Sequence, residues 1–426
     1  ELLLSFQSSI QDPSRHLSSW SYSSSNDVCL WYGVVCSNFS RVVSLDLSGK
    51  NISSQILTST IFRLPFLQTI NLSNNKFSGP VPHDIFTTSP PSLRYLNLSN
   101  NNLSGSIPRG FLPNLYTLDL SNNMFSGDIY EDIRLFSNLK VLDLGGNVLS
   151  GHVPACFGNL SRLEFLTLAS NQLTGGIPTE LGLMKNLKWI YLGYNNLSGE
   201  IPYQLGDLSS LKHLDLVYNN ISGPIPPSLG DLKELEYMFL YQNKLSSQIP
   251  PSIFSLKNLI SLDFSDNSLS GEIPELLSQL QSFEILHLFS NNLSGKIPEG
   301  LTSLPRLQVL KLWSNKFSGE IPASLGKHNN LVASLSPGDR PGLSKGSYRH
   351  AYTLIGNPPC QLLVARVDDR FAFFEIPIHP YPYTSTYSPA HREMEREGLS
   401  IGLLSEVTLD QPARKTLYIT LCGSQD

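Results

Sequence analysis

The apolar residues of the chain recur at fixed intervals between Val42 and Pro322. Each copy follows the pattern L-x-x-L-x-L-S-x-N-x-L-S-G-x-I-P, and from Leu115 onward a new copy begins every 24 residues. The x-L-x-L-x part predicts a short strand, because successive side chains of a strand point to opposite faces. The L-S-G-x-I-P part predicts a second extended segment ending at proline, followed by a short helical turn. Twelve copies are present, beginning at Val42, Leu67, Leu93, Leu115, Leu139, Leu163, Leu187, Leu211, Leu235, Leu259, Phe283 and Leu307.

A period in the twenties with this spacing of Leu and Asn is typical of a leucine-rich repeat solenoid, which is an α/β fold. One repeat cannot bury its own leucines, so each repeat must pack against its neighbours. We therefore expect Ile190 to contact its equivalents Leu166 and Leu214. The Asn after each strand, such as Asn195, is expected to bond backbone groups of the adjacent turn. Lys50 takes that place in the first copy.

Residues 1–41 precede the repeats and are expected to cap the first one. Four apolar residues have the spacing of one helical face: Leu2, Leu3, Phe6 and Ile10. We expect Asp12-Pro13 to end that helix. The repeats are expected to fill residues 42–332, and the end of the array then leaves Leu307, Leu310 and Leu312 without a following repeat to cover them.

A disulfide between Cys29 and Cys36 is predicted to close this cap. Two buried free thiols are the alternative, and a zinc site is a poorer interpretation because no second Cys or His pair follows. Cys156 is expected to be a free thiol on a convex turn. Cys360 and Cys422 would be able to pair if the segment around them folds.

Composition and charge narrow the function. Charged residues make up 15% of the chain, against about 25% in an average domain. The net charge of −5 comes without a basic stripe, so nucleic acid is not an expected partner. No hydrolase signature is present, and His213 and His287 lie three repeats apart, too far to share a metal. We predict a binding module that is not an enzyme and holds no cofactor or metal.

Several features indicate a secreted protein. A disulfide implies an oxidising compartment, and Asn38 and Asn159 begin Asn-x-Ser acceptors for glycans away from the predicted strands. The alternative is that the N-L-S part of the repeat creates such sequences by chance. No apolar run approaches the roughly 20 residues of a membrane span, and the chain begins inside the expected cap helix, as if already trimmed. We expect the chain to be secreted or to lie at the extracellular face of the plasma membrane.

The cap and the repeats together resemble a known family. The string L-L-S-F-Q-x2-I-x-D-P-x3-L-x-S-W, then C-x-W-x-G-V-x-C, then R-V-x-x-L-D-L, runs from Leu3 to Leu47. It is similar to the ectodomains of plant leucine-rich repeat receptor-like kinases, and the similarity covers residues 1–332. The repeats most resemble the branch that perceives small secreted peptides of the CLE type.

This resemblance implies a short secreted peptide as ligand, with a co-receptor leucine-rich repeat kinase as a possible further partner. It also implies a membrane helix and a kinase, before which the chain is expected to be truncated. Receptors of this branch usually hold the ligand carboxylate with an Arg-x-Arg pair, and no such pair occurs here. The ligand end is then held differently, or this chain holds only the front half of a peptide. The alternative function is that of a polygalacturonase-inhibitor-like defence protein that binds a cell-wall enzyme.

The residues between the inward leucines are expected to face the concave side. They are small and polar in early repeats, as at Thr69, Asn71, Thr117 and Asp119, and become aromatic later. Aromatic rows supply contact area for an extended peptide at low rotamer cost. The alternative is that the rings pack laterally and only stabilise the sheet. The predicted ligand-binding residues are Phe165, Trp189, Tyr191, Tyr194, His213, Asp215, Tyr218, Tyr237, Phe239, Tyr241, Asp263, His287, Phe289, Lys311 and Trp313.

Residues 333–426 contain no repeat and have no assigned fold. A hairpin is expected from Gln361–Val367 and Phe371–Ile378, a short helix at Pro389–Glu397 and a strand at Leu417–Leu421. The segment from Leu343 to Tyr352 resembles a kinase phosphate loop that has lost two glycines. No catalytic kinase segment follows it, so a foreign or out-of-frame end is the better interpretation.

Overall fold

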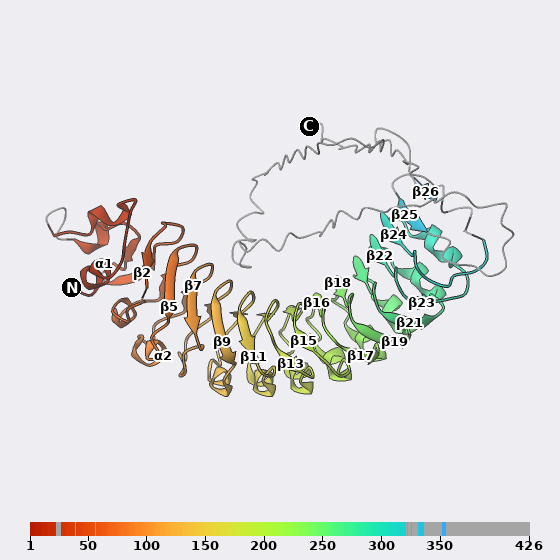
Figure 1. The fold of residues 1–426 in the computed structure, drawn as a ribbon, viewed down its shortest axis with the longest axis horizontal. Coiled ribbons are helices and arrows are strands. Elements are labelled where there is room, and N and C mark those ends of the chain that lie inside the picture. The colour runs from red at the N-terminus through yellow and green to blue at the C-terminus, as the bar shows by residue number, and fades with distance from the viewer. Residues whose placement is uncertain are drawn as a thin grey trace, which may run out of the picture.

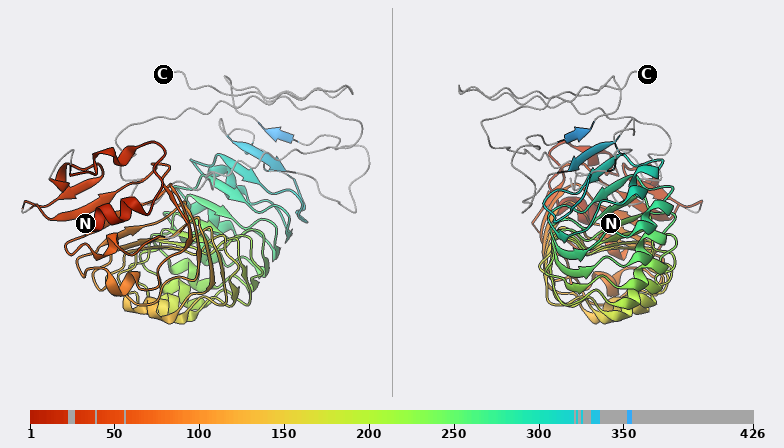
Figure 2. Two further views of the ribbon diagram at one scale, coloured as in Figure 1. Left: turned by 60° about the vertical axis from the view of Figure 1, so that its left-hand side comes forward. Right: turned by 90° about the vertical axis from the view of Figure 1, so that its right-hand side faces the viewer.

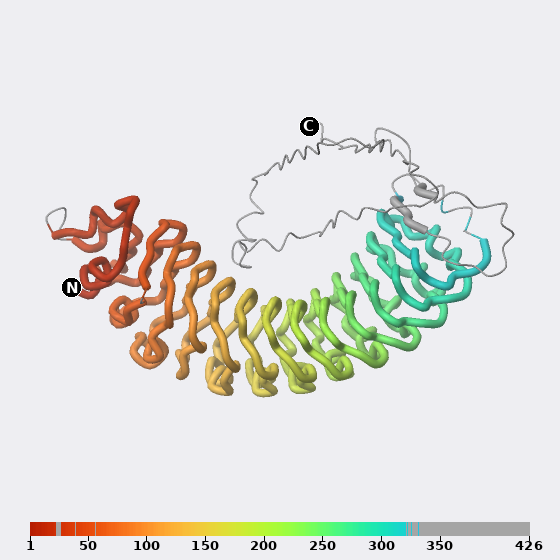
Figure 3. The backbone as a smooth tube through the Cα atoms, in the orientation of Figure 1, coloured from red at the N-terminus to blue at the C-terminus, as the bar shows by residue number. Residues whose placement is uncertain are grey.

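The computed structural model describes residues 1–22, 27–38, 40–55, 57–320, 322, 325, 331–335 and 352–354, with 332–335 and 352–354 described by their backbone. The described repeats form a curved solenoid in which each coil is one repeat (Figures 1 and 3). Strands line the concave side of the arc, and short helices line the convex side. The hairpin, the helix and the C-terminal strand expected in the tail, with Cys360 and Cys422, lie outside the described residues. So does the segment that resembles a phosphate loop, apart from Tyr352.

The concave side is one sheet of neighbouring parallel strands. Twelve of its strands come one from each repeat: β2 (Val42–Asp46), β4 (Thr69–Asn71), β6 (Tyr95–Asn97), β8 (Thr117–Asp119), β10 (Val141–Asp143), β12 (Phe165–Thr167), β14 (Trp189–Tyr191), β16 (His213–Asp215), β18 (Tyr237–Phe239), β20 (Ser261–Asp263), β22 (Ile285–His287) and β24 (Val309–Lys311). Pairing keeps a constant register, so Ile190 lies opposite Leu166 and Leu214 as expected. All three are fully buried.

The L-S-G-x-I-P segments form shorter parallel ladders beside the main sheet. Their strands are β3 (Ser53–Ser54), β5 (Lys76–Pro80), β7 (Asn102–Gly105), β9 (Met124–Asp128), β11 (Val148–Ser150), β13 (Thr174–Gly175), β15 (Asn196–Leu197), β17 (Ser222–Pro224), β19 (Lys244–Gln248), β21 (Ser268–Gly271) and β23 (Asn292–Leu293).

The convex side consists mainly of 3₁₀ helices. Those of the repeats are η3 (Ile61–Arg63), η4 (Glu131–Leu135), η5 (Ala155–Asn159), η6 (Thr179–Leu183), η7 (Tyr203–Asp207), η8 (Pro227–Asp231), η9 (Pro251–Ser255), η10 (Glu275–Gln279) and η11 (Glu299–Ser303), with the α-helical turn α2 (Ile85–Thr88). Their glycines permit close stacking: a Cβ at Gly182 would lie 2.3 Å from the carbonyl oxygen of Gln204 in the next repeat. The coils therefore stack closely, as seen along the array (Figure 2).

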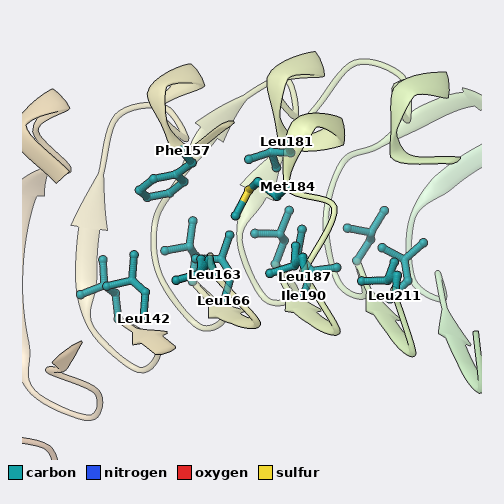
Figure 4. Packing of buried hydrophobic residues seen from close by; sticks show 14 of the residues in the cluster. Leu142, Phe157, Leu163, Leu166, Leu181, Met184, Leu187, Ile190 and Leu211 are labelled. Carbon is teal, nitrogen blue, oxygen red and sulfur yellow. The ribbon is translucent and has the colours of Figure 1, made fainter. Parts of the chain in front are cut away.

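The core runs continuously between sheet and convex helices. Figure 4 shows Phe157, Leu181 and Met184 on the helix side, facing Leu163 and Ile190 on the strand side. Each of these side chains is 1% exposed or less. Because every repeat contributes the same few leucines, the core extends by addition and has no central nucleus of its own.

The predicted asparagine positions connect the repeats. In Asn171, Nδ2 donates to the carbonyls of Leu144 in the preceding repeat (3.0 Å) and of Leu168 in its own repeat (3.0 Å). Its Oδ1 accepts from the backbone N–H of Leu149, at 2.9 Å, also in the preceding repeat. Equivalent bonds form at Asn219 and Asn291. The expected role of this asparagine is therefore confirmed.

The cap forms as predicted, with one difference. α1 (Leu2–Ser8) buries Leu3 and Phe6, but it ends at Ser8 and does not extend to Asp12-Pro13. The reason is that Gln11 forms a two-way backbone pair with Ser53, at 2.8 and 3.0 Å, and so leaves the helix. η1 (His16–Ser19) and η2 (Val28–Leu30) complete the cap.

The Cys29–Cys36 disulfide is present, whereas Cys156 is a free thiol. The disulfide joins η2 to strand β1 (Val34–Cys36). Strand β1 pairs antiparallel with β2 and so covers the first edge of the sheet.

The far end of the sheet continues beyond residue 332. Strand β25 (Val332–Leu335) pairs parallel with β24, and β26 (Tyr352–Leu354) pairs antiparallel with β25. Leu325 and Leu331 are buried in the core. Leu307, Leu310 and Leu312, expected to lie uncovered, are at most 3% exposed. That expectation was wrong because backbone pairing and two further leucines extend the array after its side-chain pattern fails.

None of the helices in the described part of the chain has the length and apolar character needed to cross a lipid bilayer.

We predict that Asn171→Ala destabilises the solenoid, while Gln172→Ala, at the exposed next position, leaves its stability nearly unchanged. The first substitution leaves backbone groups of two repeats without partners, at a cost of about 1–3 kcal/mol for each buried group. Urea unfolding of the two variants measures this difference. Equal midpoints for both variants would show that the asparagine bonds do not hold the repeats together.

Candidate ligand-binding face

The register of the main sheet aligns equivalent side chains into rows. In each three-residue strand the middle side chain enters the core, and the two flanking ones face the concave side. Trp189, His213 and Tyr237 are consecutive partners in one row, and Tyr191, Asp215 and Phe239 are consecutive partners in the next. Residues 24 positions apart in the sequence thus become neighbours on one surface.

The structure brings the predicted aromatic residues of β12 to β18 into one continuous cluster. The Phe165 ring centroid lies 6.5 Å from that of Trp189 and 5.6 Å from that of Tyr191. Tyr191 contacts His213 at 4.7 Å, and His213 stacks on Tyr237 at 5.3 Å. The rings therefore pack laterally, which was the alternative to ligand binding, but Phe165, Trp189, Tyr191 and Tyr237 all remain partly exposed.

Two predicted polar residues lie beneath this cluster. His213 is 6% and Asp215 is 3% exposed, so neither is presented on the surface as expected. His213 lies between Tyr191 and Tyr237 with the edge of Phe239 at 5.2 Å, and Asp215 Oδ1 accepts from the backbone N–H of Val217 at 3.1 Å. His213 is thus enclosed by neighbouring rings, and Asp215 is bonded within its own turn, so neither side chain is presented to a ligand.

Three tyrosines extend the cluster toward the turns after the strands. Tyr194 stacks on Tyr218 with centroids 4.5 Å apart and planes 18° apart, and Tyr241 meets Tyr218 edge-on at 5.5 Å. The backbone is left-handed at Tyr194 (φ 55°) and at Tyr218 (φ 49°), a conformation unfavourable for bulky residues. The same turn position holds Asn74, Asn100, Asn122, Gly146 and Ser170 in earlier repeats. Strain of this kind is often found at functional sites.

The hydroxyl groups of Tyr194 and Tyr241 are hydrogen-bonded to each other. Burial raises the pKa of Tyr194, and burial together with the Tyr194 bond raises the pKa of Tyr241 far above its ordinary value. Both side chains therefore stay neutral, so this part of the face offers apolar rings with neutral polar tips.

A second aromatic group lies on β22 and β24 and the turns that follow them. Phe289 and Trp313 stack with centroids 4.4 Å apart and planes 11° apart, and Lys311 Nζ lies 5.9 Å from the Phe289 centroid. His287 Nδ1 lies 2.9 Å from Asp263 Oδ2, and Asp263 Oδ1 accepts from the backbone N–H of Ser265 at 3.0 Å. The face thus has two aromatic groups, with the polar strand β20 between them.

A row of alternating charged residues, not predicted from the sequence, lies along the edge of the sheet where its strands begin; we call it the charge ladder. Glu164 accepts from Lys140 Nζ at 3.0 Å and from Lys188 Nζ at 2.7 Å. The hydrogen bond from Lys188 lowers the pKa of Glu164. Lys212 and Glu236 form the next pair, at 2.9 Å. Opposite charges 24 residues apart were the available signal. With three lysines and two glutamates the ladder keeps one net positive charge, and exposed pairs of this kind add little stability.

The early concave face carries two neighbouring carboxyl groups. Asp119 and Asp143 are direct partners on β8 and β10, and Asp119 is only 2% exposed. Burial raises the pKa of both, and the Asp119 charge raises that of Asp143 further. Asp119 had been expected as a surface polar group. Its burial means that the pair carries less negative charge in the folded chain than two exposed carboxylates would.

We predict that Asp143→Asn is about as stable as wild type near pH 4 and more stable near pH 7. The pKa of Asp143 is raised in the folded state above the unfolded value of about 3.9. The carboxyl therefore contributes its full stability below about pH 3.9, and this contribution is lost as pH rises through the folded-state pKa. Asparagine is never ionised and does not lose it. Thermal unfolding from pH 4 to 8 measures the difference. Asp231→Asn, at an exposed convex position, is the control and should follow wild type. A constant offset between Asp143→Asn and wild type across this range would contradict the prediction.

Comparison with known protein families matches almost every region of the repeats. A model described as leucine-rich repeat region matches residues 195–336. Models described as leucine rich repeat match residues 66–87, 92–113 and 113–173. A model described as leucine rich repeat N-terminal domain matches residues 1–37. The last model covers the cap, and the others cover the solenoid.

Among curated relatives, the chain matches the leucine-rich repeat receptor-like serine/threonine-protein kinase SKM1 of Arabidopsis thaliana. The identity is 84% over 137 residues, which is 32% of this chain and 14% of that protein. This receptor is a member of the family that the cap string and the repeats resemble. The aligned part spans about one seventh of its length.

Solved structures of plant receptors have the same fold. The ectodomain of GASSHO1/SCHENGEN3 from Arabidopsis thaliana, in complex with CASPARIAN STRIP INTEGRITY FACTOR 2, is 33% identical with a TM-score of 0.72, covering 78% of this chain and 43% of that chain. The ectodomain of the Arabidopsis receptor kinase HAESA, in complex with an extended IDA peptide hormone, is 32% identical with a TM-score of 0.65, covering 78% and 61%. The chain therefore belongs to the leucine-rich repeat family and is a segment of the ectodomain type found in plant leucine-rich repeat receptor-like kinases.

Proposed function

We propose that the concave face from β12 to β24 binds a short, extended, secreted peptide of the CLE type. The observation that carries this proposal is the partly exposed rings of the two aromatic groups, which lie on either side of β20 and extend from Phe165 to Trp313. Large rings that already contact one another lose little rotamer freedom on binding. The peptide hormone bound to the HAESA ectodomain, a structural neighbour, supports the proposal.

The size of the face fits such a ligand. Neighbouring strands lie about 4.8 Å apart, so the seven strands from β12 to β24 span roughly 30 Å. An extended chain covers about 3.3 Å per residue, so this length accommodates about ten residues. The function is binding without chemistry: the rings supply contact area, and the tyrosine hydroxyls orient the peptide backbone.

The charges on the face limit how strongly it can bind a carboxylate of the peptide. Lys311 is the single lysine or arginine among the predicted contact residues, and it offers one point charge where a paired arginine would bind a carboxylate in bidentate fashion. Most of the binding free energy is therefore expected to come from the rings. The contact with a co-receptor kinase stays a prediction. The extracellular placement of the chain follows from its similarity to receptor ectodomains and is part of this proposal.

We predict that Trp189→Ala combined with Tyr191→Ala abolishes peptide binding. Truncating two central rings removes two candidate hot spots, each typically contributing at least about 2 kcal/mol. Calorimetric titration with synthetic CLE-type peptides, one at a time, measures the loss. Tyr203→Ala, at a convex tyrosine that is 68% exposed, is the matched control and should bind as wild type does. Unchanged affinity in the double variant would remove the concave face as the binding site.

We further predict that Tyr218→Asn weakens peptide binding while changing the stability by no more than about 1 kcal/mol. Asparagine relieves the left-handed strain of about 1–3 kcal/mol, which offsets the loss of two ring contacts of about 0.5–1.5 kcal/mol each. Peptide titration and urea unfolding of the same sample separate the two effects. A large loss of stability with unchanged affinity would make Tyr218 a structural residue and contradict its role in binding.

A further inference from the structure

Three neighbouring convex helices end at equivalent positions. η4 ends at Leu135, η5 at Asn159 and η6 at Leu183, and these helices stack on one another. Leu135 is 40% and Leu183 is 59% exposed, and Asn159 between them is also exposed. Two large apolar side chains therefore border one exposed amide on the convex side of the arc.

The later repeats carry a different kind of residue at this position. In the five repeats that follow, the same 3₁₀ helix ends at a polar residue: Asp207, Asp231, Ser255, Gln279 or Ser303. The position faces solvent, so polar residues suit it. Between η4 and η11, leucine stands at this position only on the two sides of Asn159. In the repeat before η4 the equivalent position holds Phe111, which is 45% exposed. The large apolar residues at this position are thus grouped at Phe111, Leu135 and Leu183, and the two leucines lie on either side of Asn159.

Asn159 has the features of a modification site. It begins the acceptor sequence Asn159-Leu160-Ser161, with Asn159 and Ser161 exposed and Leu160 buried. Within the described residues, the Asn159 side chain makes no hydrogen bond, whereas Asn71 donates to Asp46 at 3.2 Å and Asn97 accepts from Ser99 at 2.8 Å. Those two acceptor sequences lie on concave strands. Asn159 is therefore accessible to an enzyme in a way that Asn71 and Asn97 are not.

We propose that Asn159 carries an N-linked glycan whose first sugar lies over Leu135 and Leu183 and covers them. The Asn159 amide nitrogen attacks the anomeric carbon of a lipid-pyrophosphate-linked oligosaccharide. The new C–N bond replaces the C–O bond to pyrophosphate, and an amide proton is lost as the lipid pyrophosphate leaves. The C–H face and N-acetyl methyl group of the sugar pack on the leucines, and its hydroxyl groups face water. Such a glycan keeps an apolar patch from promoting association.

The proposal is independent of ligand binding, because the glycan lies on the convex side and the proposed ligand on the concave side (Figure 1). It therefore stands or falls by its own experiment, whatever the outcome of the peptide titrations.

The test is a double-mutant cycle on protein secreted from eukaryotic cells. The four proteins are wild type, Asn159→Gln, Leu135→Asp/Leu183→Asp, and the triple variant that combines all three changes. Two of the following repeats carry aspartate at this position, at Asp207 and Asp231. Peptide mass mapping gives the occupancy of residue 159, and retention on a hydrophobic-interaction column gives the exposed apolar surface. Circular dichroism confirms the fold of each variant.

We expect residue 159 to be glycosylated in wild type and Asn159→Gln to elute later. The two aspartates should shift the elution of the unglycosylated protein strongly and that of the glycosylated protein little, because the sugar already covers the leucines. Removing the glycan from folded wild type with an amidase leaves an aspartate at position 159, so the elution of the product should match that of Asn159→Asp treated in the same way, without any effect on folding.

Three results would overturn the proposal. The first is an unmodified Asn159. The second is an equal elution shift from the aspartates with and without the glycan, which would mean that the sugar does not cover the leucines. The third is a glycosylated wild type that is dimeric by light scattering and becomes monomeric in Leu135→Asp/Leu183→Asp, which would assign the leucines to a second copy of the chain.

Discussion

The hydrogen bonds of one asparagine side chain per repeat hold the whole array in register. At Asn171 one amide bonds backbone groups of two repeats at once, through Leu144 and Leu149 of the preceding coil and Leu168 of its own. The carbonyls of Leu144 and Leu168 directly follow their strands, and the Leu149 N–H belongs to β11. Without the asparagine these bonds would be lost inside the array. The leucines supply most of the burial free energy, but they are non-directional. The asparagine fixes which coil lies over which.

A constant register converts a sequence period into surface rows, and the rows determine what the face does. Phe165, Trp189 and Tyr191 meet because their strands pair without a shift. Ring-on-ring packing and peptide binding are therefore compatible: lateral contacts hold the rings in place, and their outer faces remain partly exposed. The left-handed tyrosines at 194 and 218 fit this view, since the fold tolerates their strain where a stacked pair results.

The two sides of the solenoid have different freedom to vary. On the concave side each variable residue lies opposite its equivalents on both neighbouring strands, so a change at one position can alter the environment of three. On the convex side the helices pack closely at glycines such as Gly182, but their last residues point to solvent. Such positions can accept a glycan or a charge without disturbing the core, and this separates the proposed modification at Asn159 from the proposed ligand face.

The sequence alone determined the solenoid, its inward leucines, its asparagine ladder and its disulfide-closed cap, because a pattern repeated twelve times fits one packing arrangement. It also identified which strands carry aromatic residues. Only the tertiary structure decided how deeply each concave residue lies. Asp119, His213 and Asp215 follow the same pattern as exposed residues, yet they are buried, because burial depends on the size of side chains 24 residues away. Strand β25 was likewise beyond the sequence pattern. Its pairing uses backbone groups, which the side-chain pattern does not report.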